Sequence, residues 1–195
     1  MAMPAAAHRW TIEERDALPE DRFRRELLDG ELLVSPGCSG THQEILRRLL
    51  RVVGDYVDDQ GIGTVSFAPF DVIYSPNDVL EPDLIVLPAP VSTLGKHWDG
   101  ANSPPTLVVE IVSPSSRTRD YQRKRDFYVA GHALEYWIVD PGQRSIVVVR
   151  RGESDVTHAV ELVWQPARGA ALVATQVAAL RIDIHALFAG LPSGE

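Results

Sequence analysis

At 195 residues, with 45% hydrophobic and 24% charged side chains, the chain has a globular composition, and we expect one domain over residues 1–195 with an ordered core at 9–190. The net charge of -8 argues against a general polyanion-binding coat of the histone-like kind, and a single cysteine, Cys38, excludes an internal disulfide. No apolar run reaches the roughly 20 residues of a membrane helix and no signal peptide is recognisable, so a soluble, cytoplasmic protein without a membrane partner is expected.

The N-terminal third predicts two helices separated by a hairpin. Thr11 and Glu14 have capping-box spacing, which predicts a short helix. The Asp-Gly dipeptide within residues 25–34 is typical of a two-residue hairpin turn. A second capping box at 41–44 predicts a longer helix that ends at Gly61. The apolar stripe of this helix consists of Ile45, Leu46, Leu49, Leu50, Val53, Tyr56 and Val57.

The rest of the chain alternates β-type runs with a second long helix. Strands are predicted at 63–67, 70–74, 84–87, 106–112 and 134–139. The long Pro-, Gly- and Ser-rich segment 88–105 is a candidate lid or binding loop. A helix is predicted from Ser113 to about Ala130, closed by Gly131. A trailing antiparallel meander at 145–150, 156–163 and 171–174, with a last helix at 183–189, completes a mixed α/β order.

Two acids stand in apolar runs 27 residues apart, Asp83 within 80–87 and Glu110 within 107–113. Burying an ionised carboxylate without a partner costs several kcal/mol, so a divalent metal or a Lys or Arg side chain is expected nearby. Taken singly, Asp83 could instead cap a turn, and Glu110 could form a core ion pair with an arginine. Two carboxylates about 4 Å apart repel by roughly 4 kcal/mol at an effective dielectric of 20, and Mg²⁺ or Mn²⁺ turns that repulsion into attraction.

Lys124 is the candidate cation. Asp120, Lys124 and Tyr128 are four residues apart on the predicted helix and share one face, which points Lys124 inward if the aromatic residues mark the buried stripe. The alternative is that Lys124 snorkels to the surface and pairs with Asp120. The same helix starts with the most basic window of the chain, residues 117–125, which holds five cations against one acid.

Other site chemistries are poorly supported. The six histidines include no pair at i, i+3 or i+4 and there is no Cys-x-x-Cys, so zinc is unlikely to be the metal. There is no glycine-rich phosphate loop and no Gly-x-Ser-x-Gly elbow. His42, in the first turn of its helix, is expected at the surface more readily than in a catalytic role.

Seven short fragments carry a family resemblance through their order and spacing. They are Arg9-Trp10-Thr11, the run Glu26 to Leu32, Ser35-Pro36 followed by His42, Glu81-Pro82-Asp83-Leu84, the run Val109 to Ser115, Asp120 with Lys124 and Tyr128, and the run Glu135 to Pro141. Together, from Trp10 to about Phe188, they resemble the Uma-type family of restriction endonucleases in the PD-(D/E)XK nuclease superfamily. The resemblance implies a restriction-endonuclease-like mixed sheet flanked by helices, with an antiparallel C-terminal extension.

The resemblance also implies roles for individual residues. Asp83, Glu110 and the backbone carbonyl of Ile111 would ligate Mg²⁺ or Mn²⁺. The superfamily's usual lysine position is Val112 here, so the plain motif is broken, and the family moves the lysine to the helix position of Lys124. The outer members of the site that the pattern suggests are Glu26, His42, Ser113 and Asp120.

The resulting hypothesis is a metal-dependent endonuclease that hydrolyses DNA phosphodiester bonds, acting as a possible homodimer. Sequence-independent phosphate contacts are expected from Arg117, Arg119, Arg123 and Arg125. Two alternatives remain open at this point. One is a catalytically inactive interaction module that retains the nuclease fold, and the other is a hydrolase of small phosphate esters.

Overall fold

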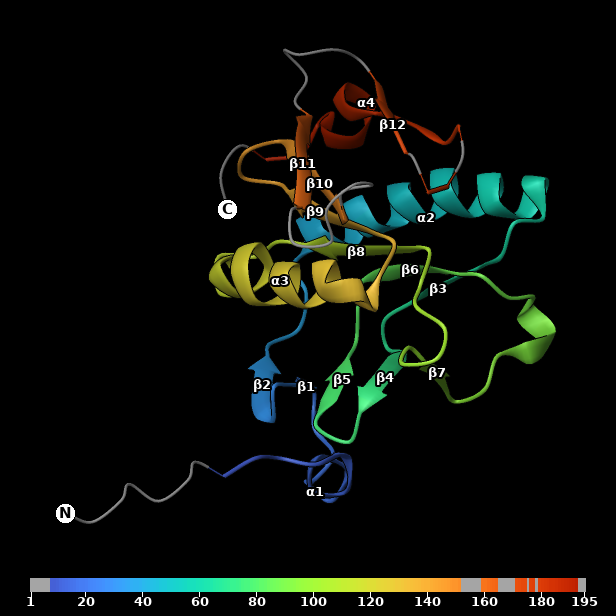
Figure 1. Cartoon of the computed structure of the whole chain (residues 1–195). Coiled ribbons are helices and arrows are strands. Elements are labelled where there is room, and N and C mark those ends of the chain that lie inside the picture. The colour runs from blue at the N-terminus through green and yellow to red at the C-terminus, as the bar shows by residue number, and fades with distance from the viewer. Residues whose placement is uncertain (1–7, 152–158, 165–170, 175, 178, 193–195) are drawn as a thin grey trace.

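The computed structural model describes residues 8–151, 159–164, 171–174, 176–177 and 179–192 (Figure 1). Its strands are β1 (Arg24–Leu28), β2 (Glu31–Ser35), β3 (Thr64–Phe67), β4 (Asp71–Ser75), β5 (Asp78–Leu80), β6 (Leu84–Leu87), β7 (His97–Asp99), β8 (Leu107–Ile111), β9 (Glu135–Asp140), β10 (Ser145–Arg151), β11 (Ala159–Trp164), β12 (Ala171–Val173) and β13 (Arg181–Asp183). Its helical segments are α1 (Ile12–Asp16), α2 (Gly40–Gln60), η1 (Val91–Thr93), η2 (Arg119–Lys124), α3 (Arg125–Phe127), η3 (Tyr128–His132) and α4 (Ile184–Phe188).

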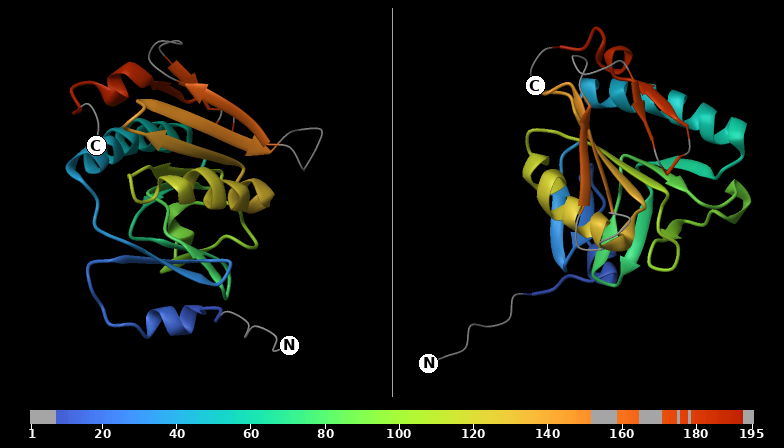
Figure 2. Two further views of the ribbon diagram at one scale, coloured as in Figure 1. Left: turned by 90° about the vertical axis from the view of Figure 1, so that its left-hand side faces the viewer. Right: turned by 45° about the horizontal axis from the view of Figure 1, so that its top comes forward.

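Two mixed sheets organise the described residues. The larger has the order β11-β10-β9-β8-β6-β3, in which β8 and β9 are parallel and the other neighbours antiparallel. The smaller has the order β2-β1-β5-β4-β7, with β4 and β7 parallel. Helices flank the sheets, and β12 and β13 form a separate antiparallel pair near the C-terminus (Figures 1 and 2). The predicted mixed α/β fold with an antiparallel C-terminal extension is confirmed.

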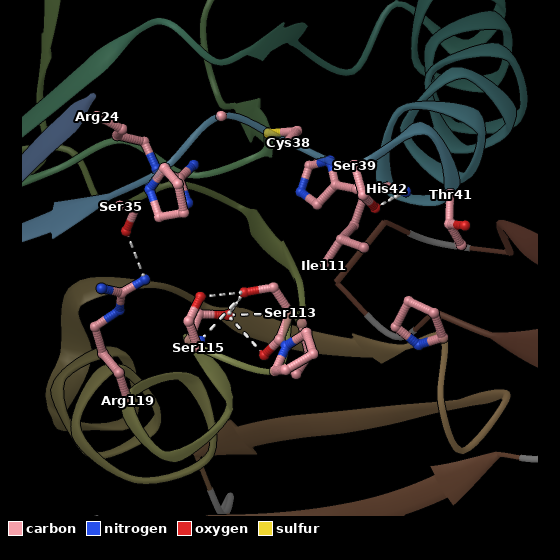
Figure 3. Close-up of a pocket in the computed structure, with 16 residues that line it drawn as sticks. Arg24, Ser35, Cys38, Ser39, Thr41, His42, Ile111, Ser113, Ser115 and Arg119 are labelled. Atoms are coloured by element: carbon pink, nitrogen blue, oxygen red, sulfur yellow. Dashed lines mark hydrogen bonds between the residues drawn. The ribbon is translucent and has the colours of Figure 1, made fainter. Parts of the chain in front are cut away.

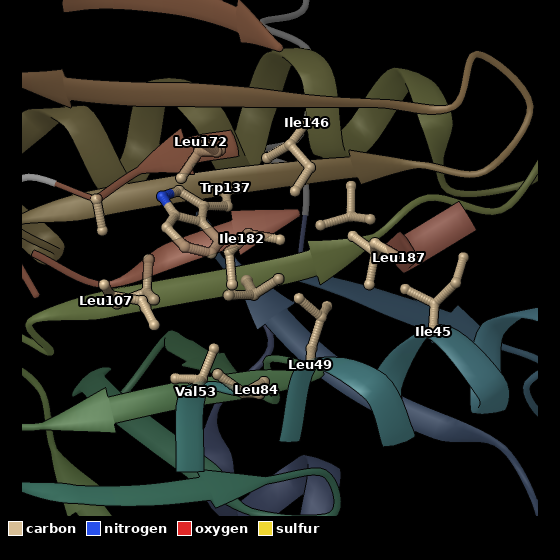
Figure 4. Close-up of a cluster of buried hydrophobic side chains, with 14 of the residues drawn as sticks. Ile45, Leu49, Val53, Leu84, Leu107, Trp137, Ile146, Leu172, Ile182 and Leu187 are labelled. Carbon is tan, nitrogen blue, oxygen red and sulfur yellow. The ribbon is translucent and has the colours of Figure 1, made fainter. Parts of the chain in front are cut away.

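Helices pack against both faces of the six-stranded sheet (Figure 2). Successive side chains of a strand point to opposite faces, so β8 sends Leu107, Val109 and Ile111 to one side and Val108 to the other. The first side meets α2 in an apolar cluster that includes Leu49 and Trp137 (Figure 4). The second side packs against the helix formed by η2, α3 and η3. Because Glu110 has the parity of Val108, it faces this second helix.

The helix predicted over 113–130 begins only at 117, after a turn at 114–116, and it is wound differently. Most of it is π-helical, in η2 and η3, where backbone hydrogen bonds skip one residue more than in an α-helix. Gly131, at φ 119°, closes it as expected. Wider winding of this kind is frequent at functional sites. Both Asp120 and Lys124 lie on η2, and both are buried.

The N-terminal predictions hold with one correction. The capping box of α1 is present, and β1 and β2 form the expected hairpin, with positive φ at Asp29 and Gly30. The capping box expected at 41–44 is wrong. Helix α2 begins at Gly40, and its N-cap is Ser39, whose hydroxyl accepts a hydrogen bond from the His42 amide. The structural reason is that Ser39, not Thr41, has the extended backbone of a cap.

Three expectations for the later chain are corrected. Segment 88–105, expected as one loop, contains η1 and β7, and β7 joins the smaller sheet beside β4, while its role as a lid or binding loop stays a prediction. Strand β5, which pairs with β4 and β1, was not predicted. Residues 171–173 pair with β13 instead of extending the meander. Of the strand expected at 156–163, residues 156–158 lie outside the described residues. Over the described chain, no helix has the length and apolarity needed to cross a membrane.

Candidate active site

Strand pairing places the two predicted acids opposite each other. The β6–β8 register pairs Leu84 with Val109, and one further step sets Asp83 against Glu110. Directly opposed side chains on antiparallel strands have Cβ atoms about 5 Å apart. Both carboxylates are 1% exposed, and the Ile111 amide donates to Asp83 Oδ2 at 2.7 Å. The sequence therefore placed two carboxylates that the fold brings side by side.

Strand β1 of the smaller sheet contributes two charged side chains to the same place. Arg24, Glu26 and Leu28 alternate along β1 and so share one face. Glu26 is fully buried, and its Oε1 accepts a hydrogen bond from the Glu81 amide at 2.9 Å. Arg24 donates from Nη1 to Asp83 Oδ1 at 2.8 Å. The two sheets thus meet at a cluster of charges.

Lys124 closes the cluster from η2. Its ammonium donates to Glu26 Oε1 at 2.8 Å and to Glu110 Oε1 at 2.6 Å, and the side chain is fully buried. The alternative in which Lys124 snorkels to pair with Asp120 at the surface is therefore wrong. Asp120 is buried as well, and its negative charge adds to those that hold the Lys124 ammonium in its charged form. The inward direction predicted from helix periodicity is confirmed.

His42 belongs to the cluster, and its expected place at the surface is wrong. Its Nε2 lies 3.0 Å from Asp83 Oδ2, and the residue is 7% exposed. The Ser39 cap turns the first turn of α2 toward β6, which brings the imidazole to the carboxylate. Burial lowers the pKa of His42, but the hydrogen bond to Asp83 and the neighbouring Cys38 raise it to about 10. The imidazole is therefore protonated at neutral pH.

The carboxylates differ in their pKa values because their partners differ. Burial raises the pKa of Asp83, but the His42 hydrogen bond and the Arg24 charge outweigh it and hold that pKa well below its usual range. Burial raises the pKa of Glu110 to about 8, because its loss of water outweighs the attraction of Lys124. Burial also lowers the pKa of Lys124, but the charges of Glu110 and Glu26 more than offset this and raise it. Opposed acids with separated pKa values are typical of functional sites.

A cavity of about 280 Å³ opens beside the cluster (Figure 3). Its walls come from the segment before α2, the end of β8 and the start of the η2 helix. Its polar lining includes Arg24, Ser35, Ser39, Thr41, His42, Ser113, Ser115, Ser116 and Arg119. The Ile111 backbone also lines it, whereas the carboxylates of Asp83 and Glu110 lie behind this wall.

Of the four arginines expected at phosphates, the structure brings Arg119 to the cavity. Its Nη2 donates to Ser35 Oγ at 3.0 Å (Figure 3). All four arginines also pair with acids: Arg119 with Asp120, Arg117 with Asp140, Arg123 with Glu31, and Arg125 with Asp126. Ser113 lines the cavity, and Val112, the superfamily's usual lysine position, is buried among apolar side chains.

The groups available as metal ligands decide whether the cluster suits a divalent cation. Among the described residues, no three His, Cys, Asp or Glu side chains converge as a ready-made ligand set. Asp83 and Glu110 nevertheless supply two adjacent carboxylates, although Asp83 Oδ2 accepts a hydrogen bond from the Ile111 amide in this arrangement. Glu26 Oε2 is buried with no hydrogen-bond partner within the described chain. An orphaned carboxylate oxygen and oxygen-only donors fit Mg²⁺ or Mn²⁺.

Arg24 is the site residue that sequence reasoning missed. It lies within 4 Å of three carboxylates, those of Glu26, Asp83 and Glu110. The alternation of Arg24, Glu26 and Leu28 sets Arg24 on the buried face of Glu26, but the predicted hairpin began at Arg25 and left Arg24 outside it. From sequence, an arginine at the end of a hairpin strand is expected to be solvent-exposed, and only the crossing of the two sheets buries it.

Comparisons with known proteins show the fold and the family of the chain. A crystal structure titled as a putative nuclease belonging to DUF820, from Anabaena variabilis ATCC 29413, is similar in fold, with a TM-score of 0.74 and 20% identity over 91% of this chain and 97% of that one. No curated protein matches the chain. The model of the Uma2 family, described as "Putative restriction endonuclease", matches residues 12–178. The chain therefore belongs to the Uma2 family, as the sequence resemblance predicted.

Proposed function

We propose that the protein is a metal-dependent endonuclease that hydrolyses phosphodiester bonds in DNA. The observation that supports this most directly is the buried pair Asp83 and Glu110 on adjacent strands, with the Lys124 ammonium 2.6 Å from Glu110. Membership of a family of restriction endonuclease type supports nuclease activity in general. DNA as the substrate and a divalent metal as the cofactor are part of this proposal.

Asp83, Glu110 and the Ile111 carbonyl would hold Mg²⁺ or Mn²⁺. When bound, such an ion polarises the scissile phosphate and lowers the pKa of a coordinated water. Ionised carboxylates are the form that binds a cation. The low pKa of Asp83 supplies one directly, and Glu110 releases its proton as the cation binds.

The protein's own residues position and neutralise the reaction centre. Lys124 orients the attacking water and offsets charge that develops on the phosphate. Glu26 accepts from Lys124 and fixes the direction of its ammonium. His42 holds Asp83 Oδ2, and Arg119 in the cavity contacts a phosphate beside the cut. Lys124 thus replaces the lysine that is absent at Val112.

A plasmid-nicking assay tests the proposal. Wild-type protein is expected to convert supercoiled plasmid to open-circular and linear forms with Mg²⁺ or Mn²⁺ and not with EDTA. Asp83→Asn and Lys124→Gln each should lower the rate by at least about 100-fold, which is the usual cost of losing such a group. Arg125→Gln, on the same helix but paired with Asp126, serves as the matched control. Equal rates in wild type and Asp83→Asn would rule out this site.

A second measurement tests whether one protomer or two act on the duplex. We propose a homodimer for double-strand cleavage, because one centre cuts one strand. Sedimentation of the protein with a short duplex in Ca²⁺ is expected to give two chains per duplex. A single chain per duplex, with nicked product only, would overturn the dimer and leave the nuclease assignment standing.

An inactive interaction module is the second candidate, favoured by the saturation of the acids in this arrangement. Asp83 already accepts from Arg24, His42 and the Ile111 amide, and Glu110 from Lys124. A module of this kind predicts no Mn²⁺-induced rise in melting temperature and no cleavage of plasmid. Hydrolysis of short nucleotides without plasmid cleavage would instead identify a small-ester hydrolase.

A further inference from the structure

The cavity beside the charged cluster has the chemistry of an anion site. Two arginines, Arg24 and Arg119, line it together with serine and threonine hydroxyls, and Figure 3 shows both arginines on the side opposite His42. No Asp or Glu appears among the described residues of its lining. In a chain of net charge -8, a cavity without acids is a local exception that favours a bound anion.

Arg24 belongs to the cavity and to the acid cluster at once. Its Nη1 lies 2.8 Å from Asp83 Oδ1, and its Nη2 lies 3.9 Å from Glu110 Oε2. The side chain is 17% exposed, and the exposed part faces the cavity. A flexible arginine in this position can reach either the carboxylates or an anion in the cavity without movement of its strand.

Arg24 and a divalent cation need the same oxygens. The guanidinium spans the two carboxylates that the proposed metal site uses, and like charges about 4 Å apart repel by roughly 4 kcal/mol for unit charges at an effective dielectric of 20. A doubly charged ion repels it more. Binding of the cation therefore requires Arg24 to leave, and the adjoining space is the cavity it already lines.

We propose that the cavity binds one phosphate group of the substrate strand, and that Arg24 turns into it when a divalent cation replaces the guanidinium between Asp83 and Glu110. This proposal rests on the nuclease function proposed above. Arg119, held by Ser35, is the fixed partner of the phosphate, and Arg24 is the mobile one. Two guanidinium groups match phosphate oxygens in bidentate geometry.

The exchange couples the two ligands. Cation binding releases Arg24 for the phosphate, and a bound phosphate holds Arg24 away from the carboxylates, so each ligand strengthens the other. Arg24 is therefore a positioning residue in the metal-free protein and a substrate-binding residue in the loaded one. Substitution of Arg24 should strengthen binding of the metal in the absence of DNA, and it should weaken the coupling between metal binding and DNA binding.

Calorimetric titration with Mn²⁺ alone tests the first half. Arg24→Gln is expected to bind Mn²⁺ about tenfold more tightly than wild type, because no guanidinium competes for the carboxylates. Arg25→Gln is the matched control, since Arg25 follows on the opposite face of β1 and pairs with Asp21. Affinities of Arg24→Gln and wild type within about twofold would overturn the exchange while leaving the metal site intact. No Mn²⁺ binding in any variant would overturn both the exchange and the metal site.

Arg24→Lys guards against a folding failure of Arg24→Gln. It keeps a positive charge for folding but presents a single ammonium that cannot span both carboxylates, so its Mn²⁺ affinity should exceed that of wild type, with Arg25→Lys as control. Wild-type affinity in Arg24→Lys, in a protein shown to be folded by circular dichroism, would overturn the exchange.

Fluorescence anisotropy with a short labelled duplex tests the second half. The ratio of DNA affinities in Ca²⁺ and in EDTA should be about tenfold larger for wild type than for Arg24→Gln or Arg24→Lys. Arg119→Gln should weaken DNA binding in both conditions, because it removes the fixed partner of the phosphate. Equal ratios in wild type and the Arg24 variants would overturn the role of Arg24 in phosphate binding.

Discussion

The two faces of the six-stranded sheet are made from alternate residues of the same strands, yet one face packs an apolar cluster and the other holds charged groups. On the α2 side, Val109 and Trp137 lie in an apolar cluster. On the other side, Glu110 stands between Val108 and Val112, under a helix that buries Lys124. A shift of one residue separates a face that only stabilises from a face that holds four buried charged groups in contact. The comparison predicts that damage to either face lowers stability, but that only one face responds to metal.

Removal of the buried cation should have the largest effect. Lys124→Met leaves Glu26 and Glu110 without their close ammonium, and breaking a buried ion pair from one side costs about 3–5 kcal/mol in the free energy of unfolding. Urea unfolding at pH 7 measures it. Arg125→Met, at the next position and part-exposed, should change stability by no more than about 0.5 kcal/mol. A loss under about 1 kcal/mol for Lys124→Met would mean that the acids do not depend on this cation.

Damage to the apolar face should cost somewhat less and should be independent of metal. Leu49→Ala opens a cavity in the fully buried cluster and should lower the free energy of unfolding by about 3 kcal/mol. Its stabilisation by Mn²⁺ in thermal unfolding should equal that of wild type, because no charged group is touched. Val52→Ala, 43% exposed on the same helix, is the control. A Mn²⁺ response lost together with Leu49 would show that the two faces are not separable.

The smallest effect at low pH, and the most diagnostic one overall, is expected at Glu110. Since the pKa of Glu110 is raised to about 8 above its ordinary 4.5, the wild-type protein loses stability as pH rises between those values. Glu110→Gln removes that loss. At pH 5 the variant should lie within about 1 kcal/mol of wild type, because Gln still accepts a hydrogen bond. At pH 8 it should gain on wild type, and it should show no Mn²⁺ response.

Glu44→Gln is the control with the opposite sign. Arg47 and Arg48 lower the pKa of Glu44 to about 2, so its contribution is present above pH 4.5 and is lost as pH falls. The free energy of unfolding of Glu44→Gln should therefore fall furthest below that of wild type above pH 4.5. If Glu110→Gln followed the same pH trend as Glu44→Gln, the buried carboxyl of Glu110 would be ionised throughout, and the raised pKa of Glu110 would be contradicted.

Much of the fold was accessible from sequence because local chemistry dictates it. The Asp-Gly dipeptide specified the β1–β2 hairpin, and the helix ending at Gly131 was placed by its C-terminal glycine. The errors fall where local signals compete. Both Ser39 and Thr41 can cap a helix, and only the observed backbone selects Ser39. Strand β5 is too short to show periodicity.

For the candidate site, the apolar runs around Asp83 and Glu110 and the helix periodicity around Lys124 predicted these three residues, and the family resemblance added Glu26 and His42. Arg24 escaped notice, because its burial depends on how β1 of the smaller sheet crosses the larger one. All four arginines expected at phosphates form ion pairs with acids. For Arg117 and Arg123 the acid is distant in the sequence, and sequence spacing contains no information about it.

The sequence alone therefore indicated most of the elements, their polarity patterns and the acids that need a cation, because these depend on neighbours within a few residues. Only the tertiary structure decided which cation each acid meets. Glu26 and Lys124 are separated by 98 positions, and Arg24 and Asp83 by 59, so their pairing follows from the docking of one sheet on the other. Electrostatic contacts between distant segments depend on position in space, and that position is set by packing the two sheets and their helices together.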